Sequence, residues 1–165
     1  MVKKTKPSSA TTVEIDDPLA LAPLVCIPAN LRMAARASTR LYDKALAPIG
    51  LNITQYSILS IIARVGEVPT MALAGRLSLE RTALYRALAI LERRGLIKSR
   101  TGRGREQLLS LTESGTELRE TALPIWSKVQ DVFVATFGDG WPAFLDQIRH
   151  ACAVAESSID AEISK

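Results

Sequence analysis

Cysteine and histidine are scarce in this sequence of 165 residues, which contains two cysteines and one histidine. Cys26 and Cys152 lie far apart, and neither belongs to a CxxC pair. This argues against a disulfide scaffold and a structural zinc site, and it fits a reducing compartment. His150 as the sole histidine argues against a multi-histidine metal site, and it permits a Ser-His or Cys-His catalytic pair only if His150 itself takes part. The sequence therefore predicts neither a metal site nor a cofactor.

Long apolar runs and the usual motifs of enzymes are also missing. No apolar stretch reaches the roughly 18 residues that a membrane-spanning helix requires, so no membrane partner is expected. The N-terminal segment MVKKTKPSSATTVEIDD has basic residues but no apolar segment after them, so we expect no secretory signal and a cytoplasmic location. Because a Gly-rich phosphate loop and suitably spaced catalytic carboxylates are absent as well, we do not expect an enzyme.

Positive charge is unevenly distributed, although the formal net charge is only +4. Glu92 is the only acid between positions 81 and 105, and acids outnumber bases from Glu113 onward. The basic residues of this interval are Arg81, Arg86, Arg93, Arg94, Lys98, Arg100, Arg103 and Arg105. Such a local concentration is what a phosphate-binding surface requires. The alternative interpretation is an ordinary solvated helix face. The basic turn that adjoins the helix makes this alternative less favoured.

Apolar spacing predicts a helix that begins at Ala29 and ends near Leu46, after a mobile N-terminal tail over residues 1–28. Pro48 and Gly50 are expected to end it. A row of basic residues at i, i+4 intervals marks another side of this helix and consists of Arg32, Arg36, Arg40 and Lys44. Such a row is usually solvated, but it could instead face an acidic partner or a carboxylate ligand.

Three helices in close succession are predicted over residues 51–93. Thr54 is the expected N-cap of the first, and Thr70 is the expected N-cap of the second. Ser78 is expected to close the second helix and to cap the third, which covers residues 79–93. Two short helices joined by a tight turn are typical of a DNA-reading helix-turn-helix.

The third of these helices has two distinct faces. Its regularly spaced apolar residues, which should face the core, are Leu84, Ala87, Leu88 and Leu91. At about 100° per residue, polar and basic side chains gather on the opposite arc. In a recognition helix the N-terminal part reaches base edges, where Arg can pair with guanine and Thr can contact a base. The predicted DNA-contacting residues are Thr70, Ser78, Arg81, Thr82, Tyr85 and Arg86, although an ordinary amphipathic surface helix is the alternative.

A basic hairpin is predicted directly after this helix. Residues 96–100 and 107–111 have the composition of two strands, and the segment between them is rich in Gly and Arg. Arg103 or Arg105 at its tip could enter a minor groove, because narrow A/T-rich segments attract arginine. A flexible surface loop is the alternative interpretation of the turn.

Long helical segments occupy the rest of the chain. Thr112 is the expected cap of the first, Pro124 should kink it, and the glycines of residues 138–140 should end it before a last helix that runs to about Ile159. These helices carry more apolar surface than the small DNA-reading unit can cover. Pairing with a second copy of the chain would cover it and would suit a two-fold DNA site.

Four segments in this order resemble the multiple-antibiotic-resistance regulator (MarR) family. They are LRMAARASTRLYDKALAPIGLNITQYSIL, PTMALAGRLSLERTALYRALAILERRGLI, GRGREQLLSLTESG and ALPIWSKVQ, within roughly residues 29 to 155. The resemblance implies a mainly α fold with a small β wing, in which a winged helix-turn-helix at residues 51–111 lies between dimerisation helices at residues 29–50 and 112–165. It also implies a homodimer that binds a palindromic operator in double-stranded DNA, usually as a repressor, and is released by a small ligand or by oxidation.

The resemblance further implies a ligand pocket between the dimer helices and the DNA-reading unit. Its candidate residues here are Met33, Arg36, Arg40, Tyr56 and Trp126. An aromatic carboxylate would suit an arginine beside apolar walls. Packing or solvation is the simpler role for each of these residues taken singly.

This sequence departs from the family pattern at two places. The family wing usually has an Asp two residues before its Arg, and the turn here has none, so the choice between Arg103 and Arg105 stays open. In the peroxide-sensing branch a reactive Cys, surrounded by tyrosines, lies near the start of the first helix; Cys26 is close to that place but is followed by IPAN. A structural Cys26 is therefore preferred over a thiol-based redox sensor. A winged-helix protein-interaction module without specific DNA binding is the other alternative to the repressor.

Overall fold

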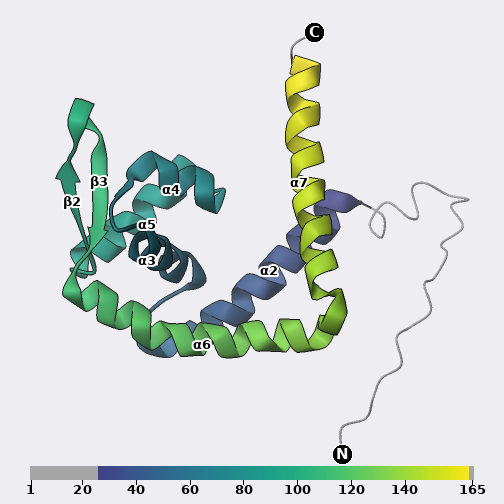
Figure 1. Ribbon diagram of the computed structural model, residues 1–165, viewed down its shortest axis with the longest axis horizontal. Helices are drawn as coiled ribbons and strands as arrows, with labels where there is room; N and C mark the ends of the chain where they lie inside the picture. Colours follow the sequence, from purple (N-terminus) through teal and green to yellow (C-terminus); the bar gives the residue numbers. More distant parts are fainter. Residues whose placement is uncertain (1–25, 164–165) are drawn as a thin grey trace, which may run out of the picture. The chain divides into compact units, whose positions relative to one another are not determined.

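The computed structural model describes residues 26–163, and within them the chain is mainly helical with one small antiparallel sheet (Figure 1). The elements are α2 (Ile27–Leu46), η1 (Ala47–Ile49), α3 (Ile53–Val65), β1 (Val68–Pro69), α4 (Thr70–Leu77), α5 (Arg81–Arg93), β2 (Ile97–Thr101), η2 (Arg103–Arg105), β3 (Gln107–Leu111), α6 (Glu113–Phe137), η3 (Gly138–Gly140) and α7 (Trp141–Ile163). This confirms the predicted fold class.

Two compact units divide the chain, and their boundary falls inside α2, between Thr39 and Arg40. The expected tail over residues 1–28 lies outside the described residues up to position 25. Its last two residues, Ile27 and Pro28, already belong to α2, because proline is tolerated in the first turn of a helix. Within residues 26–163, no single helix has the length and hydropathy needed to cross a membrane, and the bent pair Ile27–Ile49 with Ile53–Val65 meets that test on length and composition alone.

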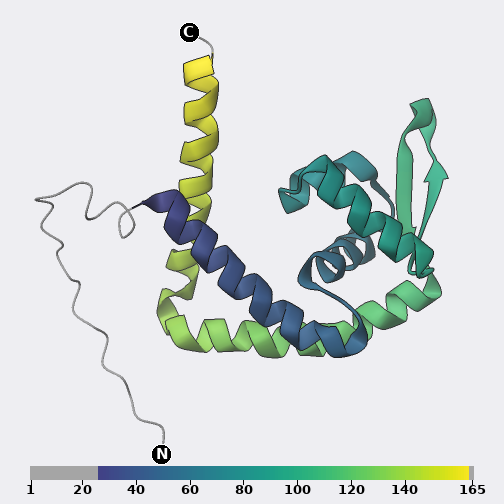
Figure 2. The same ribbon diagram turned by 180° about the vertical axis from the view of Figure 1, so that it is seen from behind.

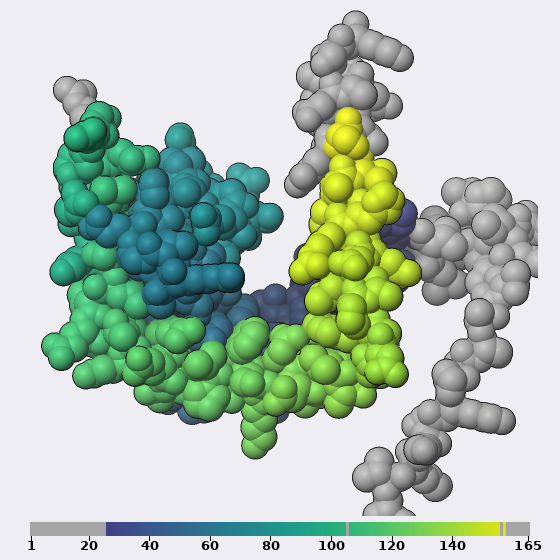
Figure 3. Space-filling model, in the orientation of Figure 1, coloured from purple at the N-terminus to yellow at the C-terminus, as the bar shows by residue number. Residues whose placement is uncertain are grey.

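The core of the second unit is built from one apolar face of each of its short helices. Its largest fully buried side chains are Leu46, Ile58, Leu59, Ile62, Leu73, Leu84, Leu91 and Leu109. Figure 2 shows α3, α4 and α5 gathered beside the hairpin of β2 and β3, and Figure 3 shows their side chains packed together. For α5, the face predicted from helical spacing is the one that joins this core.

Three of the predicted helix caps are wrong, those of α3, α4 and α5. Asn52, and not Thr54, begins α3: its side chain accepts from the Gln55 N–H at 2.8 Å, while the Gln55 side chain accepts from the Asn52 N–H at 3.1 Å. This reciprocal pair satisfies two N–H groups at once, which a threonine inside the first turn cannot do. Thr70 does not cap α4 either; it is the first residue of that helix, after Pro69.

A three-stranded sheet with the order β1-β3-β2 joins the hairpin to the helices. In β2 and β3, Ile97 pairs with Leu111 and Thr101 with Gln107, so the strands stay in register from the base to the turn. The turn lies at the end of the hairpin remote from α6 (Figure 1). The return strand has the predicted bounds, and β2 begins one residue later than expected.

The long helix α6 begins at the predicted cap and ends at the predicted glycines. The Thr112 hydroxyl accepts from the Gly115 N–H at 3.1 Å, and α6 then runs through Pro124 to Phe137. Tyr42, near the end of α2, donates to the Gln130 side chain at 2.7 Å. The last helix extends to Ile163 and is therefore longer than predicted.

Candidate functional site

Helix α5 presents one apolar and one polar face, as its sequence predicts. Leu84, Ala87, Leu88 and Leu91 are buried in the core of the second unit. The side chains on the other arc, Arg81, Thr82, Tyr85 and Arg86, are exposed, with Tyr85 at 51% of its full accessible surface. Since half of a large aromatic ring lies in solvent next to arginines, this arc is available to a partner.

The turn between α4 and α5 differs from the prediction in its chemistry. Ser78 is exposed and closes α4 in a left-handed conformation, with φ 49°. It does not cap α5, because the N-cap position there belongs to Glu80, whose side chain makes no capping hydrogen bond. A non-glycine residue in the left-handed region is uncommon, and here it lets α5 leave α4 in a new direction.

Thr70 is not part of the exposed arc. Its side chain is only 5% exposed, and its hydroxyl donates to the carbonyl oxygen of Gln107 at 3.1 Å. The hydroxyl is thus used to attach the start of α4 to strand β3. Sequence reasoning assigned Thr70 a surface role because this contact joins positions far apart in the chain.

The hairpin turn carries the remaining predicted DNA-contacting residues. Arg103 is exposed and begins the short turn η2, in which Gly104 takes φ 68°. Glycine adopts this left-handed conformation without the steric cost that other residues have. Arg105 ends the same turn.

An ion pair attaches the hairpin to the preceding helices. Arg100 in β2 donates from Nε and Nη2 to the two carboxylate oxygens of Glu67, at 2.7 and 2.5 Å. The hydrogen bond from Arg100 lowers the pKa of Glu67, and the same bond raises the pKa of Arg100. A carboxylate from outside the turn therefore holds a wing arginine, although the turn itself lacks the Asp of the family pattern.

Replacing Glu67 with glutamine should remove a small, pH-dependent stabilisation. Because the pKa of folded Glu67 lies below its usual 4.5, the ion pair stabilises the fold above that value and is lost as the pH falls through the lowered one. Thermal unfolding should therefore separate wild type from Glu67→Gln at neutral pH and low salt, with the difference vanishing in acid. Glu106→Gln, in an exposed glutamate of the same hairpin, is the control, and an equal shift in both variants would contradict the assignment.

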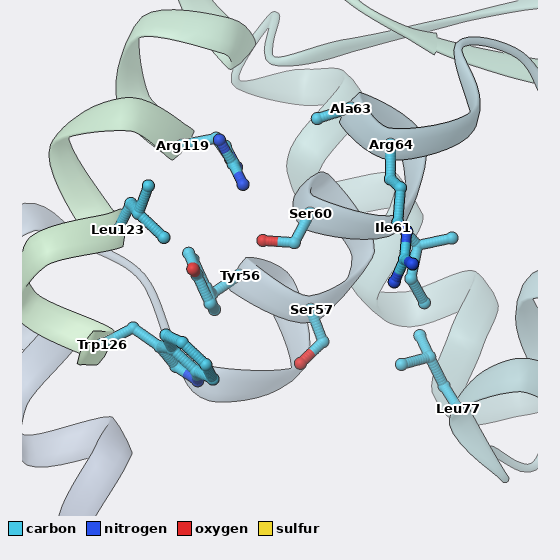
Figure 4. A pocket seen from close by; sticks show the side chains of 10 residues that line it. All are labelled: Tyr56, Ser57, Ser60, Ile61, Ala63, Arg64, Leu77, Arg119, Leu123 and Trp126. Carbon is cyan, nitrogen blue, oxygen red and sulfur yellow. The ribbon is translucent and has the colours of Figure 1, made fainter. Parts of the chain in front are cut away.

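A pocket of about 560 Å³ lies between α3 and α6, beside the end of α4 (Figure 4). Its lining residues are Tyr56, Ser57, Ser60, Ile61, Ala63, Arg64, Leu77, Arg119, Leu123 and Trp126. The rings of Tyr56 and Trp126 stack with centroids 5.9 Å apart. The pocket is therefore lined by apolar and aromatic surface with a few polar groups, which is the usual composition of a small-molecule site.

Two polar atoms in this pocket lack hydrogen bonds within the described part of the chain. They are Ser60 Oγ and Arg119 Nε, which are both buried. Figure 4 shows the two side chains pointing into the same space from α3 and α6. An unsatisfied buried polar group costs about 1–3 kcal/mol, so an oxygen acceptor placed here would relieve that cost.

The structure brings together only part of the predicted ligand-binding set. Tyr56 and Trp126 line the pocket, whereas Arg40 is exposed and is not in its lining. Met33 and Arg36 belong to the first unit, where both are exposed.

The pocket lining also contains residues that the sequence analysis does not predict, among them Ser60, Arg64 and Arg119. Helical spacing could have identified them, because residues at these intervals share one face of a helix with the predicted Tyr56 or Trp126. In α6, Arg119 precedes Trp126 by two turns. In α3, Tyr56, Ser60 and Arg64 follow each other at i, i+4 intervals.

Both cysteines are free thiols and lie in different parts of the chain. Cys26 is half-buried just before α2, and Cys152 is exposed on α7. Across residues 26–163, no cluster of three or more His, Cys, Asp or Glu side chains could hold a metal ion. The described residues therefore offer the exposed arc of α5, the hairpin and the pocket as candidate sites.

Comparison with known proteins agrees with this geometry. The model of the MarR family matches residues 51–102. The transcriptional regulator MosR of M. tuberculosis, solved in complex with DNA, is 35% identical, with a TM-score of 0.73 over 81% of this chain and 98% of that chain. A second MosR structure is 34% identical, with a TM-score of 0.76 over 82% of this chain and 99% of that chain. A search of curated proteins gave no match.

A more distant structure shares the fold. PcaV of Streptomyces coelicolor, solved with its natural ligand, is 21% identical, with a TM-score of 0.70 over 81% of this chain and 96% of that chain. The family match at residues 51–102 covers α3, α4, α5 and β2, and the similarity to MosR extends over most of both chains. This chain therefore belongs to the MarR family of transcriptional regulators.

Proposed function

We propose that the protein is a homodimer that represses transcription by binding a palindromic operator in double-stranded DNA. The observation that carries this proposal is the exposed arc of α5, where Arg81, Thr82, Tyr85 and Arg86 stand opposite a buried apolar face. The similarity to MosR, which was solved in complex with DNA, supports it. In this arrangement the N-terminal half of α5 reads base edges in the major groove.

The hairpin would contact the neighbouring minor groove. Arg103 is exposed in the turn, and the Glu67–Arg100 pair fixes the strand that leads to it. A minor groove narrowed by A/T-rich sequence has an enhanced negative potential that favours an inserted arginine. Arg103 is therefore our first candidate for this contact, with Arg105 as the alternative.

Exposed apolar surface on the long helices supports a homodimer. Val132, Phe137 and Val154 in α6 and α7 are 58, 38 and 49% exposed, and Ile27 and Met33 in the first unit are each 65% exposed. These side chains lie on the helices that the family resemblance assigns to dimerisation, where a second copy would bury them. Pairing of residues 29–50 and 112–165 between two copies would cover them and would place two α5 helices on one two-fold site.

Selection from random duplexes, followed by gel-shift titration, tests the proposal most directly. The wild-type protein should sediment at twice its chain mass of 17.9 kDa and should select two inverted half-sites. Its affinity should fall steeply and linearly with the logarithm of salt concentration, because bound phosphates release counterions. Selection of no sequence, or binding insensitive to salt, would favour the protein-interaction alternative.

The pocket between α3 and α6 would receive the small molecule that releases DNA. The stacked Tyr56 and Trp126 rings offer a face to a planar ligand, and Arg119 Nε and Ser60 Oγ offer unpaired polar atoms beside them. An aromatic carboxylate matches both features, since its ring packs on the aromatic wall and its oxygens accept from arginine. The unpaired atoms favour this signal over oxidation of Cys26.

Arg119→Ala should weaken binding of benzoate and 2-hydroxybenzoate by about tenfold to a hundredfold, since a charge-assisted hydrogen bond is worth about 1.5–3 kcal/mol. The fold should tolerate the change because the Arg119 Nε that it removes has no hydrogen-bond partner among residues 26–163. The measurement is fluorescence titration in a Trp141→Phe background, where Trp126 is the sole tryptophan. Lys128→Ala removes a charge from an exposed position of the same helix. If Arg119→Ala and Lys128→Ala bind the two carboxylates with equal affinity, Arg119 is not part of the ligand site.

A further inference from the structure

The C-terminal end of the recognition helix α5 is fastened to a distant part of the chain by one arginine. Arg94, the C-cap residue of α5, donates from Nη1 to the carbonyl oxygen of Gly50 at 2.5 Å. Gly50 lies in the connection between α2 and α3. Because 44 positions separate the two residues, the bond ties α5 to the end of the long helix α2.

The connection that Arg94 reaches is itself rigid. Gly50 has φ 72° and donates its own N–H to the Ala47 carbonyl at 2.9 Å. Asp43, in the last turns of α2, accepts from the first N–H of α3 at 2.7 Å, and Leu46 is fully buried. The end of α2 and the start of α3 therefore move as one piece, to which Arg94 is attached.

The start of α6 holds the same end of α5. The Thr112 hydroxyl donates to the Gly95 carbonyl at 2.6 Å, and the Thr112 N–H donates to the Leu96 carbonyl at 3.1 Å. Gly95 and Leu96 are the two residues directly after Arg94. The C-terminal end of α5 is thus bonded both to the connection that follows α2 and to the N-cap of α6.

The DNA-reading end of α5 is held by its buried face, which begins at Leu84, and no hydrogen bond joins that end to the long helices among the described residues. Its N-cap, Glu80, makes no side-chain capping bond, and the preceding turn is held only within the motif, by the Leu79 N–H donating to Ala74 at 3.1 Å. With 13 residues at about 1.5 Å each, α5 is about 20 Å long. A tilt of about 10° at the fixed end would therefore move the reading end by about 3 Å, close to the rise of one base pair.

We infer that Arg94 is a positioning residue that sets the direction of α5 relative to the long helices, and thereby the spacing between half-sites that the dimer accepts. This rests on the proposed function, because spacing has meaning only for a dimer on paired half-sites. Arg94 acts through its bond to Gly50 and not through DNA. Its loss leaves the base-reading arc of α5 chemically intact and leaves the Thr112 bonds in place, but it removes one of the two attachments at this end, so the helix can tilt over a wider range.

The test uses the duplex selected by the full-length wild-type protein, remade with one base pair added or removed between its half-sites. Wild type should lose about tenfold in affinity on either change, since each shifts a half-site by about 3.4 Å along the duplex and rotates it. Arg94→Ala should lose less than about threefold, because a helix that is held less firmly at this end accommodates the shift. Arg93→Ala removes the same charge from the exposed neighbouring position. It should weaken binding to all three duplexes about equally and keep the steep wild-type dependence on spacing.

Arg94→Lys keeps the charge on a shorter side chain and should give an intermediate dependence; it replaces the alanine variant if that protein does not fold. Circular dichroism melting of each variant establishes folding before the DNA titrations. If wild type selects no paired half-sites, the proposed function fails and this inference fails with it. If wild type shows the sharp spacing optimum and both Arg94 variants retain it, only the positioning role of Arg94 is overturned.

Discussion

Gly115→Ala is expected to destabilise the protein by about 3 kcal/mol or more, a large part of the 5–15 kcal/mol that holds a typical domain together. A Cβ on Gly115 would overlap the carbonyl group of Leu96, which is backbone and cannot rotate away. Moving α6 outward would break the bonds from the Thr112 hydroxyl to Gly95 and from the Thr112 N–H to Leu96. The close approach of these two backbones therefore requires glycine.

Thermal unfolding at one fixed protein concentration measures this effect. The midpoint should fall by roughly 10 °C, given about 2–4 °C for each kcal/mol in a chain of this size. Gly75→Ala is the matched control, because Gly75 lies exposed inside α4 with no atom within 4 Å of an added Cβ. That variant should be stabilised by about 0.5–1 kcal/mol, since alanine is the better helix former. A midpoint within one degree of wild type for Gly115→Ala would refute the close approach.

Helical periodicity predicted much of the fold because burial of one helix face is a local property of the sequence. Leu84, Leu88 and Leu91 of α5 were placed correctly from their spacing alone. Thr112 is the predicted cap of α6, and the structure confirms it. Asn52 and Thr54 are both possible N-caps of α3. Asn52 is the one used because Gln55, three residues later, completes a capping box with it.

The contacts that sequence reasoning missed join positions far apart in the chain. Arg100 pairs with Glu67, Arg94 with Gly50, and the Thr70 hydroxyl with Gln107, at separations of 33, 44 and 37 positions. Each depends on how two elements pack, which no local spacing encodes. Composition gave only the basic interval that contains Arg94 and Arg100, and it treated both as surface charge.

The same reason explains why only part of the candidate site was predicted. The exposed arc of α5 is a property of one helix, so its residues follow from that helix alone. The pocket is a property of two helices, and the unpaired atoms of Ser60 and Arg119 meet only because α3 and α6 pack with those faces together. Tyr56 and Trp126 were proposed through the family resemblance, which supplies this packing indirectly.

Arg86→Ala is expected to weaken binding to the selected operator by about 1–3 kcal/mol for each half-site, which is at least roughly thirtyfold for the two together, with little change on random DNA. Arg86 is exposed in the second turn of α5, where a guanidinium can reach the O6 and N7 acceptors of a guanine. A single alanine leaves that guanine unread, so selectivity should relax at one base pair in each half-site. The gel-shift measurement compares the operator, operators mutated at single positions, and a scrambled duplex.

The salt dependence of DNA affinity shows whether Arg86 contacts a base or only contributes positive charge near the phosphates. A base contact displaces no condensed counterion, so the slope of log affinity against log salt should stay at the wild-type value in Arg86→Ala. Arg93→Ala removes the same charge two turns later on the same helix, where a phosphate contact is expected, and should weaken all sequences about equally while making the slope shallower by about one for each subunit. If Arg86→Ala behaves in the same way as Arg93→Ala, with equal losses on operator and scrambled DNA, then Arg86 contributes charge alone and sequence is read by the neighbouring Arg81, Thr82 and Tyr85.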